Sequence, residues 1–392
     1  MTPYNNSQPN NAPRIAVVST YPPTECGIAS FSQSLTKALT DDGFDPAIIR
    51  LMDNGDSPSP DVVVHEHHSH TDMQLTHQVL NGYDTVILQH EFGIFGGSDG
   101  EDVIDMLDAI KVPTVVVLHT VLTQPTHHQR YVLNEILERA DALVTMTQSG
   151  RNKLLSGYNV EADKVFVIAH GARPLSRIAH PSYRIRKGNR QRILTWGLLG
   201  PGKGIEWAID ALGELKEIGL NPEYVIAGQT HPQVKRQQGE DYRNSLLRRI
   251  DEHHLNDDVV FVDEYLDSHS LEKLIISADV ILLPYDSVEQ VTSGVLVEAV
   301  MAGKPIIATN FPHAQEMLED NSGILVTQKD PHAIANGLRR ILCNEIEASV
   351  MSKKLKEKSG SFLWSTIGQE YVQVAKNLID ERASQRQAFV AS

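Results

Sequence analysis

Short apolar runs alternate with helix-length amphipathic stretches along almost the whole chain, and this alternation constrains the fold most. In the first half, six apolar runs are separated by helical segments such as 28–39, 103–110 and 129–139; the runs cover residues 15–19, 47–51, 85–89, 114–118, 142–145 and 165–168. Uniformly apolar runs are typical of strands buried on both faces, and strands separated by helices pair in parallel. The first half therefore predicts βαβ units around a buried parallel sheet.

A second series of the same kind follows a break in the rhythm near residues 174–191. Its expected strands lie at 192–196, 224–227, 259–262, 280–283, 305–308 and 323–326, and its expected helices at 205–216, 242–253, 270–277, 294–302 and 333–342. A length of 392 residues also favours two domains, at roughly 100–200 residues each. The predicted fold class is α/β, with two doubly wound, Rossmann-like parallel-sheet domains and an interdomain cleft where ligands meet strand ends.

The expected boundaries follow from these two series. They are a disordered N-terminal tail at 1–13, a first domain at 14–180, a linker at 181–191, a second domain at 192–362, and a C-terminal helix with its tail at 363–392. The linker region is basic, with Arg184, Arg186, Lys187, Arg190 and Arg192. A basic linker suits an anionic acceptor or a lipid headgroup, although a solvated connector is the simpler interpretation.

Charge and cysteine content exclude several classes of protein. With 35 Lys and Arg against 50 Asp and Glu, the formal net charge of −15 excludes a surface that wraps nucleic acid. Two cysteines, Cys26 and Cys343, are too few for a disulfide scaffold and suit a reducing cytoplasm. No apolar run approaches the ~20 residues of a membrane span, and the polar N-terminus does not resemble a signal peptide. We therefore expect a cytoplasmic protein with at most peripheral membrane contact.

A glycine-rich loop from Gly197 to Gly204 lies directly between an expected strand and an expected helix. Glycines let the backbone approach a phosphate, and Lys203 with the following helix N-terminus supplies positive potential. The spacing almost fits a P-loop, but Gly204 stands where a P-loop needs the Ser or Thr that holds magnesium. The sequence thus predicts phosphate binding by Gly202 and Lys203 and argues against a magnesium-dependent ATPase or GTPase.

A second motif begins the helix expected at 294–302. Thr292 or Ser293 can cap that helix, which leaves free N–H groups near Ser293, Gly294 and Val295 as an anion site. Glu298 falls one turn further along, in an otherwise apolar helix, and a carboxylate there needs partners. The paired hydroxyls of a ribose would serve, because each donates a hydrogen bond to a group that only accepts.

These two motifs resemble the retaining glycosyltransferases of family 4, which have the GT-B fold. The family signature has two glutamates separated by seven residues, and Glu298 matches the second, whose implied role is to bind the nucleotide ribose. The position of the first, which faces the donor sugar, holds Gln290 here. The family's Lys-Gly pair matches Lys203 and Gly204, but the arginine that accompanies it is replaced by Leu198.

The resemblance extends to the loops of the first half. Gly27 opens a helix after the first strand, where the family's glycine approaches the donor phosphate. His119 ends a strand at the point where a family histidine reaches the donor sugar. The loop from His90 through Glu91, Phe92 and Gly93 suits a sugar acceptor, gripped by hydrogen bonds and ring stacking. For Cys26, a small packed residue is the preferred interpretation over a nucleophile.

The resemblance implies a retaining glycosyltransferase that moves a hexose from a nucleotide-diphosphate sugar to a saccharide or glycolipid-type acceptor. The Cys-Gly-Ile-Ala and His-Glu-Phe-Gly segments resemble a mannosyltransferase-like subgroup, which makes mannose a candidate hexose. The expected catalytic residues are His119, Lys203 and Gln290; the expected donor-binding residues are Gly27, Gly202, Lys203, Ser293, Gly294, Val295 and Glu298; the expected acceptor-binding residues are His90, Glu91, Phe92 and Gly93.

Two other functions fit the same fold. A sugar-nucleotide epimerase would share the diphosphate site but needs acid and base residues at the sugar carbon. A non-catalytic nucleotide-sugar-binding protein would fit the replacements at Gln290 and Leu198.

A metal ion is not part of the expected chemistry. The histidines at 65, 67, 68, 70 and 77 fit no ligand template and lie in a segment that we expect to be a polar connection. Cationic side chains and helix dipoles can neutralise a leaving diphosphate without a metal. The expected co-substrate is a GDP- or UDP-hexose, with no further cofactor.

Overall fold

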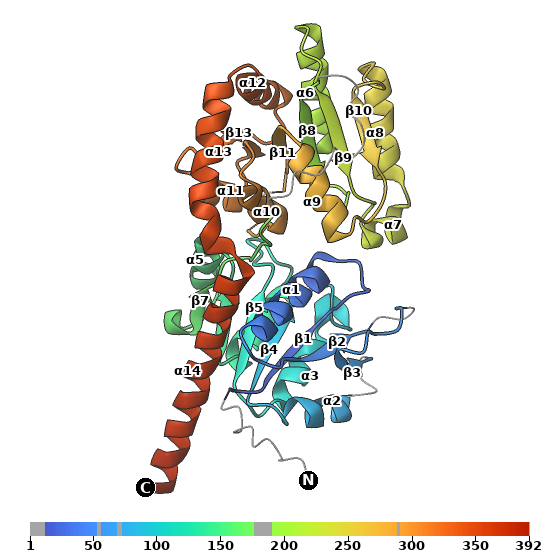
Figure 1. Cartoon of the computed structure of the whole chain (residues 1–392). Coiled ribbons are helices and arrows are strands. Elements are labelled where there is room, and N and C mark those ends of the chain that lie inside the picture. Colours follow the sequence, from blue (N-terminus) through green and yellow to red (C-terminus); the bar gives the residue numbers. More distant parts are fainter. Residues whose placement is uncertain (1–11, 53–55, 69–72, 176–189, 288–290, 392) are drawn as a thin grey trace, which may run out of the picture. The chain divides into compact units, whose positions relative to one another are not determined.

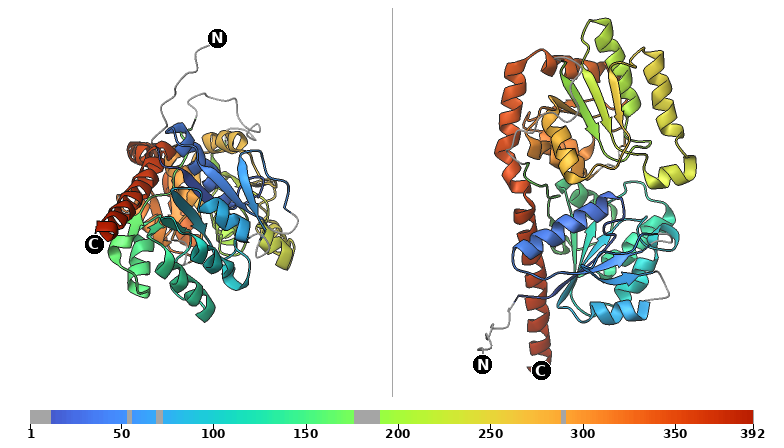
Figure 2. Two further views of the ribbon diagram at one scale, coloured as in Figure 1. Left: turned by 90° about the horizontal axis from the view of Figure 1, so that it is seen from below. Right: turned by 45° about the vertical axis from the view of Figure 1, so that its right-hand side comes forward.

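The computed structural model describes residues 12–52, 56–68, 73–175, 190–287 and 291–391. The chain forms two compact units (Figures 1 and 2). The first unit contains Met1–Ala169 and, after the second unit, Trp364–Ser392; the second unit is His170–Leu363. The expected tail at 1–13 and linker at 181–191 fall largely outside the described residues and stay predictions.

The first unit has a parallel sheet with the strand order β3-β2-β1-β4-β5-β6-β7. Its described strands are β1 (Ile15–Ser19), β2 (Ala47–Leu51), β3 (Val63–His67), β4 (Thr85–His90), β5 (Thr114–Leu118), β6 (Ala142–Thr145) and β7 (Val165–Val167). Residues of β1, β4 and β5 are buried throughout. This is expected for central strands covered on both faces.

Helices cover both faces of this sheet (Figure 2). They are α1 (Gly27–Asp41), α2 (Met73–Leu80), α3 (Asp102–Ala109), α4 (His127–Arg139), α5 (Gln148–Gly157) and the C-terminal α14 (Trp364–Ala391), with short 3₁₀ turns at Ser98–Gly100 and Ala162–Lys164. On one face, Phe31 of α1 and Trp364 of α14 pack around the alternate strand residues Ile87 and Val117. Leu88 and its neighbours face the other core, beneath α3 and α4.

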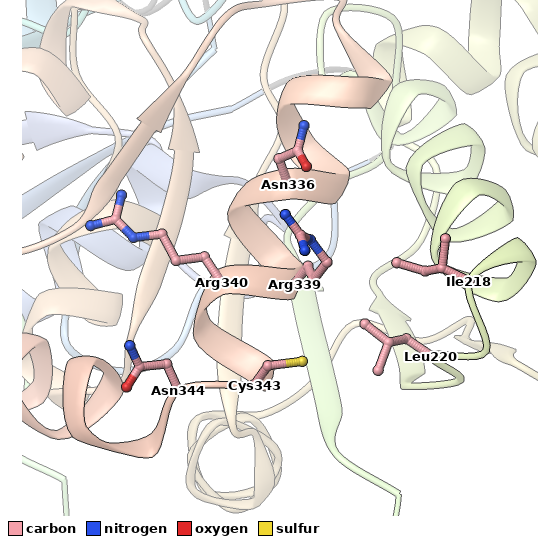
Figure 3. Close-up of a pocket in the computed structure, with 7 residues that line it drawn as sticks. All are labelled: Ile218, Leu220, Asn336, Arg339, Arg340, Cys343 and Asn344. Atoms are coloured by element: carbon pink, nitrogen blue, oxygen red, sulfur yellow. The ribbon is translucent and has the colours of Figure 1, made fainter.

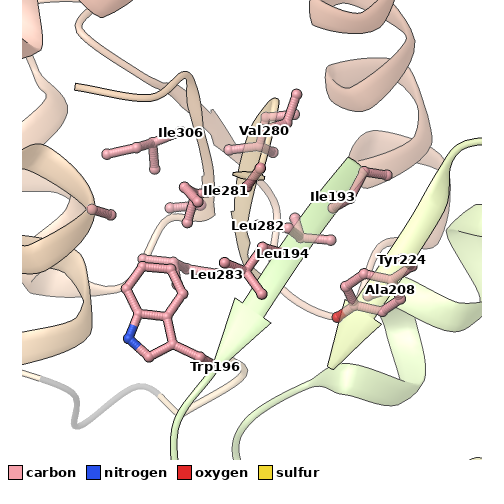
Figure 4. Close-up of a cluster of buried hydrophobic side chains, with 14 of the residues drawn as sticks. Ile193, Leu194, Trp196, Ala208, Tyr224, Val280, Ile281, Leu282, Leu283 and Ile306 are labelled. Carbon is pink, nitrogen blue, oxygen red and sulfur yellow. The ribbon is translucent and has the colours of Figure 1, made fainter. Parts of the chain in front are cut away.

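The second unit repeats the architecture with the strand order β10-β9-β8-β11-β12-β13, all parallel. Its described strands are β8 (Arg192–Trp196), β9 (Glu223–Ala227), β10 (Val259–Val262), β11 (Val280–Leu283), β12 (Ile306–Thr309) and β13 (Ile324–Val326). Figure 4 shows the core between its strands and helices, where aliphatic side chains of β8 and β11 interdigitate. The predicted fold class, two parallel-sheet Rossmann-like domains, is therefore confirmed.

The helices of the second unit connect these strands. They are α6 (Ile205–Glu217), α7 (Pro232–Gln238), α8 (Asp241–Glu252), α9 (Ser268–Ser277), α10 (Gly294–Ala302), α11 (Pro312–Leu318), α12 (Pro331–Leu342) and α13 (Glu345–Ser359), followed by a 3₁₀ turn at Gly360–Phe362. Within the described residues, no helix combines the length and the apolar character that crossing a membrane requires.

The histidine-rich segment corrects one prediction. We expected a polar connection, but Val63–His67 form the edge strand β3, which pairs in parallel with β2. The rings of His65 and His67 hydrogen-bond the same hydroxyl, Thr76 Oγ1 on α2, at 2.8 and 2.9 Å. The strand escaped prediction because its polar side chains are satisfied by a helix rather than by water.

Two glycines of the second unit allow backbone segments to approach closely. Gly204 has φ +63°, and a Cβ there would lie 1.9 Å from the Pro284 carbonyl oxygen. Gly228 has φ +141°, and a Cβ there would lie 2.0 Å from the Gly197 carbonyl oxygen. Only glycine fits at such positions, so the loops after β8, β9 and β11 pack directly on one another.

Replacing Gly204 by alanine tests this packing. We expect Gly204→Ala to destabilise the protein by about 2–5 kcal/mol, because left-handed strain and overpacking add. The matched control is Gly219→Ala, since Gly219 has φ +81° but nothing within 4 Å of its Cβ position. The control should cost only the strain, about 1–2 kcal/mol. Urea unfolding followed by tryptophan fluorescence measures both; equal costs would contradict a steric requirement at Gly204.

Candidate functional site

The connections of the second unit reverse direction between β8 and β11, which are neighbours in the sheet. From β8 the chain passes to β9 on one side, whereas from β11 it passes to β12 on the other. Ligands of doubly wound sheets bind outside the carboxyl ends of strands at such a point. The loops there are Gly197–Gly204 after β8 and, after β11, the described residues 284–287 and 291–293.

The loop after β8 is fixed by backbone hydrogen bonds to both neighbouring loops. Leu199 N–H donates to the Gln229 carbonyl at 2.9 Å, and His231 N–H donates back to the Leu199 carbonyl at 2.8 Å. Asp286 N–H donates to the Gly202 carbonyl at 3.1 Å. Three strand-end loops thus form one continuous rim around Lys203.

Lys203 is the cation of this rim. Its Nζ lies 4.6 Å from the ring centroid of Tyr285, which is itself buried against Phe311. Among the described residues, no carboxylate oxygen lies within 4 Å of Nζ. Burial lowers the pKa of Lys203. A partly buried ammonium that only an aromatic face stabilises is available to an anionic ligand.

Helix α10 presents its N-terminus to the same rim. Ser293 is the N-cap residue: its Oγ accepts from Leu296 N–H at 3.2 Å, while its own N–H donates to His313 Nδ1 at 2.8 Å. The N–H groups of Gly294 and Val295 belong to the first turn, where donors have no intrahelical acceptor. Together with the helix dipole, they favour a negative charge at this place.

Glycine at position 294 also makes room for a histidine ring. A Cβ there would lie 2.7 Å from His170 Nε2. His170 Nδ1 contacts the Gly171 carbonyl oxygen at 2.6 Å, which makes Nδ1 the protonated nitrogen. Burial lowers the pKa of His170 to about 4. The imidazole beside the start of α10 is therefore neutral near pH 7.

Glu298 lies one turn into α10 and keeps part of its surface exposed. Its Oε2 accepts a hydrogen bond from Trp196 Nε1, the last residue of β8, at 3.0 Å. Burial raises the pKa of the Glu298 carboxyl, and the Trp196 N–H and the charge of Arg173 oppose that rise. The second unit therefore combines a cation, two backbone donors and a carboxylate acceptor. This set can bind an anion and, one helical turn further along α10, a diol.

The first unit has its own reversal point, between β1 and β4. Gly27 begins α1 beyond β1, but a Cβ there would meet nothing within 4 Å. Cys26 is the N-cap residue, and its Sγ accepts from Ala29 N–H at 3.3 Å. The packed interpretation of Cys26 thus fits its contacts. Arg50, fully buried at the end of β2, donates to Thr24 Oγ1 at 2.9 Å and so holds this loop.

The expected acceptor loop after β4 separates into inward and outward residues. His90 is fully buried, edge-on to Phe92 at 5.2 Å and stacked on Phe95 at 6.4 Å between ring centroids. Burial lowers the pKa of His90 to about 4, so its ring is neutral near pH 7. Gly93 is exposed. In this structure His90 packs inside the loop, and the neighbouring Glu91 and Gly93 are the residues that reach its surface.

Glu91 joins the loop after β4 to the end of β5. One of its carboxylate oxygens accepts from Phe92 N–H at 3.1 Å, and the other accepts from the Thr120 hydroxyl. Burial raises the pKa of Glu91, whereas both hydrogen bonds oppose that rise. The predicted acceptor residue therefore also shapes the loop that carries it.

His119 follows β5 on the same rim. Its N–H donates to the His90 carbonyl at 3.0 Å, its Nε2 lies 2.8 Å from Gln89 Oε1, and its ring meets Phe31 edge-on at 5.0 Å. The side chain keeps part of its surface exposed. The structure thus brings His119 together with the loop of His90, Glu91, Phe92 and Gly93.

Several supporting residues escaped prediction. Trp196 and Gln89 end expected strands and Tyr285 closely follows one, so their positions in the sequence indicate core or strand residues. Their role shows only in their contacts with Glu298, Lys203 and His119. The catalytic candidate Gln290 lies outside the described residues and stays a prediction. In the described part of the chain, no three His, Cys, Asp or Glu side chains gather as metal ligands would.

Figure 3 shows a shallow hollow elsewhere on the second unit, with a volume of about 640 Å³. The ends of α6 and α12 line it, through residues that include Ile218, Leu220 and Arg339. Gln191, which precedes β8, donates to the Leu342 carbonyl nearby at 3.1 Å. The hollow therefore lies at the amino ends of the strands, away from the rim around Lys203.

Comparison with known proteins agrees with this fold. Residues 26–174 match the family Glycosyltransferase Family 4, and residues 180–358 match Glycosyl transferases group 1. Anabaena Alr3699/HepE, whose structure contains UDP, superposes with a TM-score of 0.74 at 16% identity over 93% of this chain and all of that one. The first unit thus matches a family-4 glycosyltransferase model, the second matches the group 1 model, and the fold is that of the GT-B structures.

Curated relatives align over part of their length. An uncharacterized glycosyltransferase of Methanocaldococcus jannaschii, MJ1607, is 29% identical over 60% of this chain and 59% of its own. A D-inositol 3-phosphate glycosyltransferase of Corynebacterium efficiens is 24% identical over 66% of this chain and 64% of its own. The chain therefore covers less than two thirds of either relative.

His128 on α4 contacts two carboxylates of the segment between β4 and α3, and the protonation of its ring can be tested. His128 contacts Asp99 at 3.0 Å and Glu101 at 3.1 Å, and the bond to Asp99 contributes most to raising the pKa of His128. Because the folded pKa exceeds the unfolded value near 6.5, this contribution is complete below about pH 6.5 and is lost as pH rises through the folded pKa.

We expect His128→Gln to lower the melting temperature more at pH 6 than at pH 9. Thermal unfolding of the variant and its parent across this range measures the difference, with the exposed neighbour variant His127→Gln as control. A difference between parent and His128→Gln that grows with pH would contradict the raised pKa.

Proposed function

We propose that this protein is a retaining glycosyltransferase that moves a hexose from a nucleotide-diphosphate sugar to a saccharide or glycolipid-type acceptor. One observation carries the proposal: Lys203, the N-terminus of α10 and Glu298 converge at the strand reversal of the second unit. An anion site beside a carboxylate that accepts from a diol matches the diphosphate and ribose of a nucleotide sugar. The two family matches support the same class.

In this proposal the diphosphate lies against Lys203 and the Gly294 and Val295 N–H groups, while the ribose hydroxyls donate to Glu298. Leu198 occupies the place of the arginine that the related family pairs with its lysine. Lys203 then carries the charge neutralisation with the dipole of α10. Its burial strengthens the interaction, because a Coulomb attraction is larger where water is excluded.

The chemistry would rest on stabilising the leaving diphosphate. As the bond between the sugar and the diphosphate breaks, negative charge accumulates on the phosphate oxygens, and Lys203 and the α10 donors would stabilise that charge. The acceptor would bind the first unit near Glu91 and Gly93, and His119 would reach the donor sugar.

Fewer observations support the identity of the nucleotide and of the sugar. A UDP complex is known for the HepE protein that shares this fold, which favours UDP as the first nucleotide to test and GDP as the second. The mannosyltransferase-like segments around Cys26 and His90 favour mannose among hexoses. A turnover assay with UDP- and GDP-hexoses distinguishes transfer from binding alone.

Removing the charge of Lys203 tests the diphosphate site. We expect Lys203→Met to weaken UDP or GDP binding about 10- to 100-fold, because a charge-assisted contact contributes roughly 1.5–3 kcal/mol. Isothermal titration measures the dissociation constant, and a thermal shift of the parent confirms binding, since saturation at 100 times the dissociation constant stabilises by about 2.7 kcal/mol. The control is Lys353→Met, on the exposed face of α13. Unchanged affinity in Lys203→Met would exclude the proposed diphosphate site.

Changing His119 separates catalysis from donor binding. We expect His119→Ala to lower kcat at least tenfold while the dissociation constant for the nucleoside diphosphate stays within about twofold, because nucleotide contacts belong to the second unit. Steady-state transfer assays and titration give the two values, with the exposed His332→Ala as control. A variant with full kcat would remove His119 from the proposed mechanism.

A further inference from the structure

Trp196 ends β8 with only 5% of its surface exposed, and its ring belongs to the core of the second unit. Figure 4 shows its six-membered ring among aliphatic side chains such as Leu283, with the indole nitrogen turned away from them. An indole N–H only donates, and a buried one needs an acceptor. That acceptor is Glu298 Oε2, at 3.0 Å.

This hydrogen bond gives the two carboxylate oxygens of Glu298 different roles. Oε2 is committed to Trp196, whereas Oε1 has no hydrogen-bond partner among the described residues. The two side chains come from rigid elements, the end of β8 and the second turn of α10, so the carboxylate plane has a fixed direction. Oε1 is then the carboxylate oxygen that remains to accept from a ligand.

We infer that Trp196 is a positioning residue for Glu298, which holds one carboxylate oxygen so that the other accepts from the vicinal hydroxyls of a ribose. The inference rests on the proposed function and makes the Trp196–Glu298 pair the element that distinguishes ribose from 2′-deoxyribose. Trp196 precedes the glycine-rich loop, and its described hydrogen bond is to Glu298, so it would act on the nucleotide through Glu298.

The electrostatics of the pair support this assignment. Burial raises the pKa of Glu298, and a protonated carboxyl would lose one acceptor site for the diol. A donor N–H on Oε2 favours the ionised form and counters that rise. Losing the N–H should therefore move the protonation of Glu298 to higher pH.

The test compares UDP with 2′-deoxy-UDP as ligands of the full chain, by titration calorimetry. If the parent binds GDP in place of UDP, GDP and 2′-deoxy-GDP replace them. The variants are Trp196→Phe, Glu298→Gln and their double mutant. A fourth protein carries 3-benzothienyl-alanine at position 196, where sulfur replaces the N–H in a ring of the same shape. This fourth protein keeps the test valid even where Trp196→Phe fails to fold.

We expect the parent to prefer the ribonucleotide by about tenfold, as one hydrogen bond to a charged group implies. Trp196→Phe and the benzothienyl variant should reduce this preference to within about twofold while 2′-deoxy-UDP affinity stays unchanged. In the Glu298→Gln background, the change at Trp196 should have no further effect on the preference, because it acts through Glu298. The affinity of the benzothienyl variant for UDP should begin to fall at a higher pH than that of the parent as the solution is acidified.

The outcomes separate this inference from the proposed function. If Glu298→Gln loses the preference but the benzothienyl variant keeps it, Trp196 only fills the core and the inference is overturned while the ribose site stands. If Glu298→Gln itself keeps both the affinity and the preference, the proposed ribose site is wrong and the inference falls with it. If Glu298→Gln and the benzothienyl variant both lose the preference, and the double mutant loses no more than Glu298→Gln alone, the result supports both the ribose site and the positioning role of Trp196.

Discussion

The contact of the Pro284 carbonyl with Gly204 is the constraint on which the candidate donor site depends. A side chain at Gly204 would separate the loops after β8 and β11, and Asp286 N–H could then no longer reach the Gly202 carbonyl. Tyr285 lies between these two contacts, and its ring face holds Lys203. The position of the Lys203 ammonium therefore depends on the absence of a side chain at Gly204 more than on attraction between charged groups.

This arrangement also explains how an acidic chain can present an anion site. A net charge of −15 acts over the whole surface and is screened within about 8–10 Å at physiological salt. Lys203 instead lies against the uncharged ring of Tyr285, and His170 beside the start of α10 is neutral near pH 7. Local geometry can therefore favour an anion there, whereas the overall charge disfavours partners that bind through extended electrostatics.

The sequence was sufficient for the sheets because central strands such as β1 and β5 are apolar at four of five positions and buried throughout. It failed at β3, where histidines replace aliphatic residues and Thr76 on a later helix satisfies them. For the site, glycine spacing and Glu298 could be predicted, since local chemistry explains them. The role of Trp196 could not, because Trp196 ends an expected core strand and its partner lies 102 positions away.

The loop after β4 shows why residue type alone does not reveal which residues of a strand-end loop reach the surface. Successive residues of β4 point to opposite faces of the sheet, so Ile87 and Gln89 share one face while Leu88 and His90 share the other. His119 contacts Gln89 and Phe31 and therefore lies on the α1 face. His90 lies on the opposite face, enclosed by phenyl rings. Strand alternation thus places His90 and His119 in different environments. Of the two, only His119 keeps part of its surface exposed, where a ligand can contact it.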